Sequence, residues 1–208
     1  MKLYRIIFLS TLLALLPLTN LQATDRDRLA PTPPMGWMTW NMYAGPGHWN
    51  DMDMLVVGLE GKGGPSSDLG GKECSYVEYQ SQMSMWAMLA SPLAMSHDIL
   101  NTSEEARKIL LNREIIAIDQ DPLGIAAKQV LTQSGCDIYM RQLTNNRTAV
   151  AILNATDKET HIKLAFSSLG LKSRYAVRDV WAKSNVGKRA KGWSGTLKAH
   201  ETIVLVLQ

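Results

Sequence analysis

The chain has 208 residues, of which 46% are apolar and 20% are charged, the composition of an ordinary globular protein rather than of a disordered one. Its formal net charge of +3 includes Lys2 and Arg5 of an N-terminal segment without acidic residues, so the remainder carries +1 and gives no electrostatic argument for nucleic acid or an anionic membrane as a partner. Two cysteines exclude a disulfide framework and four scattered histidines lack metal-ligand spacing, so we expect neither a metal nor a cofactor.

A secretory signal peptide is predicted at the N-terminus. A basic stretch over residues 1–5 precedes an apolar run over residues 6–18, and Leu21-Gln22-Ala23 ends in the small residue that a cleavage site prefers. The apolar run is shorter than the ~20 residues that a membrane-spanning helix needs. We therefore expect residues 1–23 to be removed and the mature chain to be secreted or periplasmic, without membrane contact. Cys74 and Cys136 could form one bridge in such a compartment or remain two buried thiols, and both alternatives stay open.

Residues 24–127 are predicted to be an α/β region. Residues 33–41 form a short strand-like run, and residues 49–57 form an apolar run typical of a strand buried in a parallel sheet. Because alternate strand residues face the same side, Asp51 and Asp53 would point the same way. Residues 58–71 contain six glycines and indicate a surface loop. A phosphate-binding loop is disfavoured there because no Gly-Lys-Ser/Thr ending follows.

Three helices are predicted after this loop. Ser75 and Glu78 form a capping box ahead of a helix over residues 77–90, which Pro92 ends. A second helix starts at Thr102 or Ser103, and a short third one covers residues 115–118. Breaker residues 121–124 then close the region. The buried face of the first helix is expected to consist of Met83, Trp86, Ala87 and Ala90.

Residues 128–208 are predicted to form a second, all-β domain. Short strands are expected over residues 137–143, 148–153, 160–166, 175–181, 192–198 and 202–207. Turn signals separate them, notably Asn145-Asn146, residues 167–170 and Asn185-Val186-Gly187. Regularly spaced short strands without intervening helices indicate an antiparallel β-sandwich.

Four sequence blocks resemble the α-galactosidases of glycoside hydrolase family 27. Residues 33–41 are similar to the opening strand of that family's barrel, and residues 45–55 to its late-barrel motif, in which Asn-Asp precedes Asp-Met-Leu. Residues 84–93 and 118–124 are similar to the helix after that strand and to the exit from the barrel. The resemblance implies a (β/α)8 barrel followed by an antiparallel β domain, and hydrolysis of terminal α-linked galactose with retention of configuration.

The segment that should carry the family's chemistry is absent. The resemblance places the nucleophile and the acid/base after the fourth and sixth barrel strands, but only Met42, Tyr43 and Ala44 separate the first two blocks. Residues 24–127 amount to 104 positions, whereas a complete barrel takes ~250 residues and at least about 200. We therefore expect an incomplete (β/α)8 barrel fragment, with no catalytic residue, followed by the β-sandwich.

The resemblance also implies a remnant of the substrate site. Trp40 matches the aromatic residue that stacks on galactose, Asp53 the carboxylate that accepts hydrogen bonds from its hydroxyls, and Met54 a neighbouring wall residue; Asp51 lies beside them. Asp51 and Asp53 are not expected to be a catalytic pair, because both would approach the sugar from one side. The alternative function is a non-catalytic carbohydrate-binding or scaffold protein that uses its sandwich domain, with Trp181 and Trp193 as sugar platforms.

Overall fold

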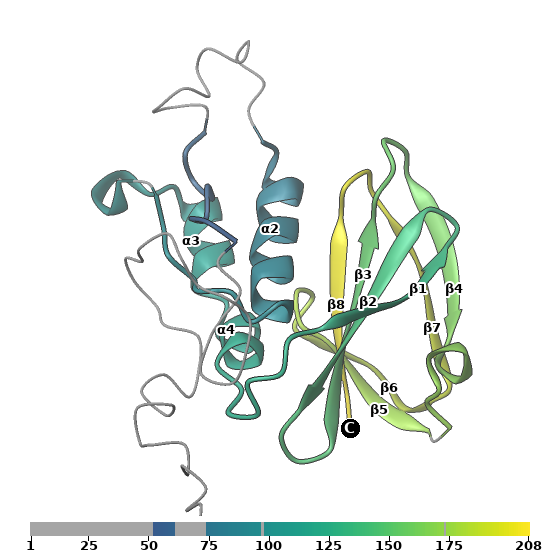
Figure 1. Ribbon diagram of the computed structural model, residues 1–208. Helices are drawn as coiled ribbons and strands as arrows, with labels where there is room; N and C mark the ends of the chain where they lie inside the picture. The colour runs from purple at the N-terminus through teal and green to yellow at the C-terminus, as the bar shows by residue number, and fades with distance from the viewer. Residues whose placement is uncertain (1–51, 61–73, 97, 173) are drawn as a thin grey trace, which may run out of the picture.

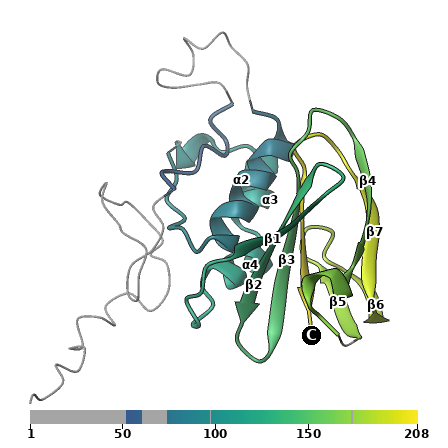
Figure 2. The same cartoon turned by 45° about the vertical axis from the view of Figure 1, so that its right-hand side comes forward.

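The computed structural model describes residues 52–60, 74–96, 98–172 and 174–208. These residues form three layers (Figures 1 and 2). Helices cover one face of a six-stranded antiparallel sheet, and a two-stranded sheet covers its other face. The predicted signal peptide, the block at residues 33–41 and most of the glycine-rich loop lie outside the described residues.

The helices begin where side chains cap them. Helix α2 (Tyr76–Met88) starts with the predicted capping box, in which the Ser75 backbone N–H donates to Glu78 Oε2 at 2.7 Å. The short helix η4 (Ile99–Asn101) precedes α3 (Glu104–Leu110), which Ser103 caps, and α4 (Arg113–Asp119), which Asn112 caps. Helix α2 ends before Ala90, whose φ of 55° is left-handed, so the predicted extension to residue 90 is wrong. Trp86 is only partly buried.

The strands pair as an antiparallel sandwich, which confirms the prediction. The large sheet has the order β1-β2-β3-β8-β5-β6, and the small sheet consists of β4 and β7. A tight turn joins β2 to β3 at Asn145 and Asn146, which have φ values of 59° and 55°. The strands are β1 (Lys128–Gln133), β2 (Cys136–Leu143), β3 (Arg147–Asn154), β4 (Thr160–Ala165), β5 (Tyr175–Asp179), β6 (Ser184–Ala190), β7 (Gly192–Leu197) and β8 (Thr202–Leu207), with the short helix η5 (Phe166–Leu169) after β4.

Both faces of the large sheet are buried. In β3, Ala149 and Ala151 face the helices, whereas Val150 and Ile152 face the small sheet. In β8, Val204 faces the helices and Leu205 the small sheet. The sheet therefore contributes to two cores, one beneath the helices and one between the two sheets.

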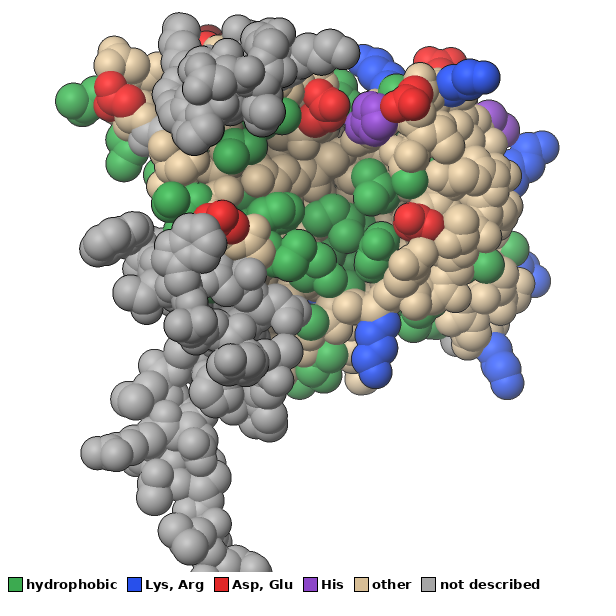
Figure 3. All heavy atoms as spheres, turned by 45° about the horizontal axis from the view of Figure 1, so that its top comes forward, with side chains coloured by type: hydrophobic (Ala, Val, Ile, Leu, Met, Phe, Trp, Pro, Cys, Tyr) green, Lys and Arg blue, Asp and Glu red, His purple; other side chains and the backbone are tan. Residues whose placement is uncertain are grey.

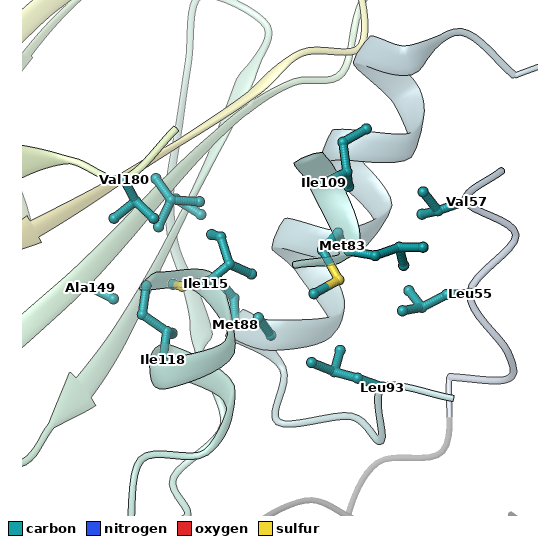
Figure 4. Packing of buried hydrophobic residues seen from close by; sticks show 14 of the residues in the cluster. Leu55, Val57, Met83, Met88, Leu93, Ile109, Ile115, Ile118, Ala149 and Val180 are labelled. Carbon is teal, nitrogen blue, oxygen red and sulfur yellow. The ribbon is translucent and has the colours of Figure 1, made fainter. Parts of the chain in front are cut away.

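The core beneath the helices crosses the predicted domain boundary between residues 127 and 128. Figure 4 shows Ile115 of α4 close to Val180 of the sandwich, and Leu55 and Leu93 on the far side of α2. Polar contacts cross the boundary too: Trp181 Nε1 donates to Ser84 Oγ at 2.8 Å, and Arg178 forms a two-bond ion pair with Glu114. The described parts of the two regions thus pack against each other as one body.

Besides the end of α2, three segments differ from the sequence predictions. The run at residues 49–57 is not a strand where it is described: only Leu55 pairs, in a parallel bridge with Met95. The amide side chain of Gln82 accepts from the Val56 N–H at 3.0 Å, so a helix side chain occupies a position that a neighbouring strand would take. Residues 185–187, predicted as a turn, lie within β6, and β1 was not predicted.

No helix among the described residues is long and apolar enough to span a membrane.

Candidate substrate-binding site

Residues 52–57 are held against α2 and the segment that follows it. The Met52 N–H donates to Ser91 Oγ at 3.1 Å, and Trp86 Nε1 donates to the Asp53 carbonyl oxygen at 2.8 Å. Leu55 bonds on both sides of Met95, accepting from the Ser96 N–H and donating to the Ala94 carbonyl oxygen. These bonds fix the backbone of the segment, in which residues 52–54 are exposed whereas Leu55 and Val57 are buried.

Asp53 and Met54 are adjacent, exposed side chains on this segment. Asp53 has a φ of 68°, a left-handed conformation that turns the chain out of the extended form just before Leu55. Its Oδ1 accepts from the Met54 N–H at 2.7 Å, which orients the carboxylate next to the thioether chain. Met54 is 37% exposed. An oriented, exposed carboxylate can accept hydrogen bonds from sugar hydroxyls, and a methionine offers an apolar contact beside it.

The other two predicted site residues, Trp40 and Asp51, lie outside the described residues. Of the four, the structure therefore brings together Asp53 and Met54. Asp53 is not in a strand conformation, so the expectation that it shares one face of a strand with Asp51 is wrong. Trp86 is a positioning residue that sequence analysis missed. Its place in the apolar stripe of α2 suggested burial, but gave no sign of the bond that its indole makes with Asp53.

A buried carboxyl group, that of Asp119, and a buried guanidinium, that of Arg141, lie between the helices and the sheet, away from this site. Asp119 is fully buried, and burial raises its pKa to about 7 in spite of a hydrogen bond from Gln120 and the charge of Arg141. Arg141 is also buried, and donates to the carbonyl oxygens of Ala87 and Asp119. Arg141 holds the helices on the sheet, because its bonds run from β2 to the backbone of α2 and α4.

The described residues contain no group of three or more His, Cys, Asp or Glu side chains placed to hold a metal ion. Cys74 and Cys136 are free thiols, the first exposed and the second buried, so the structure contains no bridge between them. Burial raises the pKa of the Cys136 thiol.

The two tryptophans considered as sugar platforms are engaged in packing. Trp181 is partly buried against the core beneath the helices and bonds to Ser84. Trp193 of β7 packs against the core between the sheets, and its ring lies so close to Gly195 that a Cβ there would stand 2.5 Å from it. Neither ring is a free, exposed platform.

Comparison with protein families gives two matches in chain order. Residues 41–121 match the family described as alpha galactosidase A, and residues 133–207 match the alpha galactosidase C-terminal beta sandwich domain. The first match begins at Asn41, the last residue of the opening block at residues 33–41, and contains Asp51, Asp53 and Met54. The second covers nearly all of the observed strands.

Individual proteins give the same result. The α-galactosidase of Oryza sativa subsp. japonica is 36% identical over 170 residues, which are 81% of this chain and 38% of the rice protein. The α-N-acetylgalactosaminidase of Gallus gallus is 36% identical over 144 residues, 67% of this chain and 33% of the chicken protein. The crystal structure of a candidate α-galactosidase/melibiase from Bacteroides fragilis superposes with a TM-score of 0.71 at 34% identity, over 78% of this chain and 35% of that one.

The chain thus spans well under half the length of these relatives, although most of it matches them. The matched parts are residues 41–121, similar to alpha galactosidase A, and residues 133–207, similar to the family's C-terminal beta sandwich domain. The chain belongs to the α-galactosidase (melibiase) family, glycoside hydrolase family 27, and combines a partial (β/α)8 barrel with the family's C-terminal β-sandwich.

Proposed function

We propose that the chain is an internally shortened α-galactosidase, derived from an enzyme that removes terminal α-linked galactose with retention of configuration, and that it hydrolyses no glycoside itself. One observation carries the proposal: only residues 42–44 separate the block similar to the first barrel strand from the late-barrel block. A complete barrel needs ~250 residues, so the strands between these blocks have no counterpart here. The export of the chain and removal of residues 1–23 are part of the same proposal.

The loss of activity follows from the mechanism. Retaining hydrolysis requires a nucleophile and an acid/base on opposite sides of the glycosidic bond, with carboxyl groups about 5 to 5.5 Å apart. Asp53 is an exposed carboxylate whose Oδ1 is oriented by the Met54 N–H. It is suited to accept hydrogen bonds from hydroxyls. The two carboxyl groups that the mechanism requires would both belong to the missing segment.

The sugar that the remnant site fits is one of galactose configuration. The relatives include an α-galactosidase and an α-N-acetylgalactosaminidase. The two sugars in these names, galactose and N-acetylgalactosamine, have the same configuration and differ in the group at the 2-position. We assign Trp40 to stacking on the ring, Asp53 and Asp51 to its hydroxyls, and Met54 to the wall. The sandwich as a non-catalytic sugar-binding module has less support, because Trp181 and Trp193 are occupied in packing.

The test is turnover of an aryl α-galactoside by the purified chain. We expect no release of the aryl alcohol above the blank, with Asp53→Asn as a matched variant that behaves identically. Turnover by the wild-type chain that disappears in Asp53→Asn would contradict the proposal, since contaminating host enzyme would be unaffected. Mass spectrometry of the exported chain should show Thr24 as its first residue, and genomic sequencing across the codons for Tyr43 and Ala44 shows whether the gene itself is shortened.

A further inference from the structure

Charge is divided unevenly along the chain. Residues 24–127 contain 7 Lys and Arg against 14 Asp and Glu, a net charge of −7. Residues 128–208 contain 13 Lys and Arg against 5 Asp and Glu, a net charge of +8. The near-neutral total therefore conceals a basic sandwich region joined to an acidic helical region.

The basic charge is concentrated in one stretch of the sandwich. Residues 160–198 contain nine Lys and Arg and a single acidic residue, Asp179. In Figure 3 the Lys and Arg side chains in view lie over the side of the molecule formed by the strands. Asp179 lies at the far end of β5, opposite Ser184, and its Oδ1 accepts from the backbone N–H groups of Trp181 and Ala182.

Backbone pairing places Arg174 and Lys191 together at one corner of the sandwich. Lys172 and Lys188 lie two and three residues from them along the chain, and Lys163 lies two residues before Ala165, which pairs with Gly192. The pair Tyr175–Ala190 places the preceding Arg174 beside the following Lys191. Phe166 links the corner to the small sheet, because its N–H donates to the Lys191 carbonyl oxygen at 2.9 Å and its carbonyl oxygen accepts from the Leu171 N–H at 3.0 Å. The corner consists of Lys163, Lys172, Arg174, Lys188 and Lys191, which are all exposed, and we call it the basic corner.

The positive charges of the basic corner are not neutralised within the described structure. The ion pairs among the described residues involve Lys108, Arg147, Arg178 and His200. None of them includes a residue of the basic corner. Five exposed cations on a rigid surface repel one another and create a positive potential that attracts a polyanion. Binding an anionic chain would relieve that repulsion and would release the counterions condensed on that chain. The affinity should therefore fall steeply as the salt concentration rises.

We propose that the basic corner binds an acidic polysaccharide, a linear glycan that carries carboxylate or sulfate groups. Clustered Lys and Arg on an exposed surface suit such a chain, which needs ion pairs at intervals but no base stacking. Single-stranded nucleic acid is bound mainly by aromatic platforms, whereas Trp193 is packed on Gly195 and Tyr175 against Phe166. Membrane binding is favoured by exposed apolar anchors, and within the described part of residues 160–198 the one large exposed apolar side chain is Val186.

This surface is separate from the candidate substrate site. Asp53 lies on the far side of α2 from the sandwich, whereas the basic corner lies where β5, β6 and β7 meet η5. The inference therefore does not rest on the proposed function. A chain without turnover could still attach to an acidic glycan.

The experiment compares two triple variants on immobilised heparin. Arg174→Gln/Lys188→Gln/Lys191→Gln removes three charges from the basic corner. Lys108→Gln/Arg113→Gln/Lys128→Gln removes one Arg and two Lys that are exposed elsewhere, so the two variants have equal net charge. Circular dichroism and urea unfolding establish that both variants are folded.

We expect the wild-type chain and the control variant to bind heparin at low salt, and the corner variant to bind at least about tenfold more weakly. The slope of log K against log salt should fall by about 0.7 to 0.9 for each contact removed. Polygalacturonate, dextran sulfate and neutral dextran as competitors separate carboxylate from sulfate recognition, and neutral dextran should not compete. Equal weakening of the two variants would overturn the proposal. So would tighter binding to a duplex DNA or to phosphatidylserine vesicles than to heparin at equal anionic charge.

Discussion

The buried carboxylate of Asp119 makes the stability of the protein depend on pH. It lies in the last turn of α4, where Gln120 Nε2 donates to its Oδ2 at 2.6 Å and its Oδ1 has no hydrogen-bond partner among the described residues. Burial disfavours the charged form and raises the pKa from its usual 3.8 to about 7, although the Gln120 bond and Arg141 oppose the shift. The folded protein therefore binds this proton more tightly than the unfolded chain does.

The sign follows from this difference in proton binding. Between about pH 4 and pH 7 the folded state keeps the proton and the unfolded state has lost it, so the free energy of unfolding falls as the pH rises. A shift of this size corresponds to ~4 kcal/mol over the interval, at about 1.4 kcal/mol per pH unit. Above pH 7 both states are ionised, and the contribution of Asp119 becomes constant.

Urea unfolding of the wild type and of Asp119→Asn at pH 5, 6, 7 and 8 measures this contribution. Asparagine cannot ionise, so the free energy of unfolding of the variant relative to wild type should rise by about 2 to 3 kcal/mol from pH 5 to pH 7 and then level off. Subtracting the two curves cancels the other titrating groups. Parallel curves over the whole range would refute the reasoning, because they would mean that Asp119 is hydrated or paired in the folded protein.

Two further predictions concern the contact between the helices and the sheet. Ile115→Ala should lower the free energy of unfolding in urea by ~2 to 5 kcal/mol because the side chain is fully buried, whereas Leu111→Ala, which alters a side chain that is 68% exposed, should change it by less than about 0.5 kcal/mol. Similar losses for the two would mean that α4 is not packed as described. Arg178→Gln removes the charge of a two-bond pair with Glu114 that is about one third exposed, so we expect a small loss of stability in urea that disappears in 1 M NaCl. A loss that persists in high salt would show that packing of the guanidinium, rather than its charge, is responsible.

Local signals in the sequence predicted the elements that local chemistry controls. The capping box of Ser75 and Glu78 marked the start of α2 correctly, and Asn145-Asn146 marked the turn between β2 and β3. Most strands of the sandwich were predicted within one or two residues, because their side chains alternate between a buried and a more exposed face.

Elements that depend on distant partners were not predictable in this way. Strand β1 has a largely exposed and polar sequence, and it exists as a strand through its pairing with β2. Strand β6 contains Asn185 and Gly187, which resemble turn residues, yet an irregular register with β5 keeps them in the sheet. The apolar run at residues 49–57 has the composition of a buried strand, but Gln82 and Asp53 give its described part another conformation.

The sequence names residues for the candidate site but does not predict their arrangement. The motif identified Asp53 and Met54, which the structure places side by side and exposed. It gave no indication that Trp86, 33 positions later, fixes the Asp53 backbone. The same limit applies to the boundary at residue 127, where composition changes abruptly although a single core extends across it.

The position of β8 has a consequence for biosynthesis. This strand lies between β3 and β5 and bonds to both, yet it follows every other strand in the sequence. While the polypeptide is emerging from the ribosome, the β5–β6 hairpin has nothing to join, and β3 exposes an unpaired edge. The complete six-stranded sheet can assemble only after translation has passed residue 207, so the partly made chain exposes strand edges that favour aggregation.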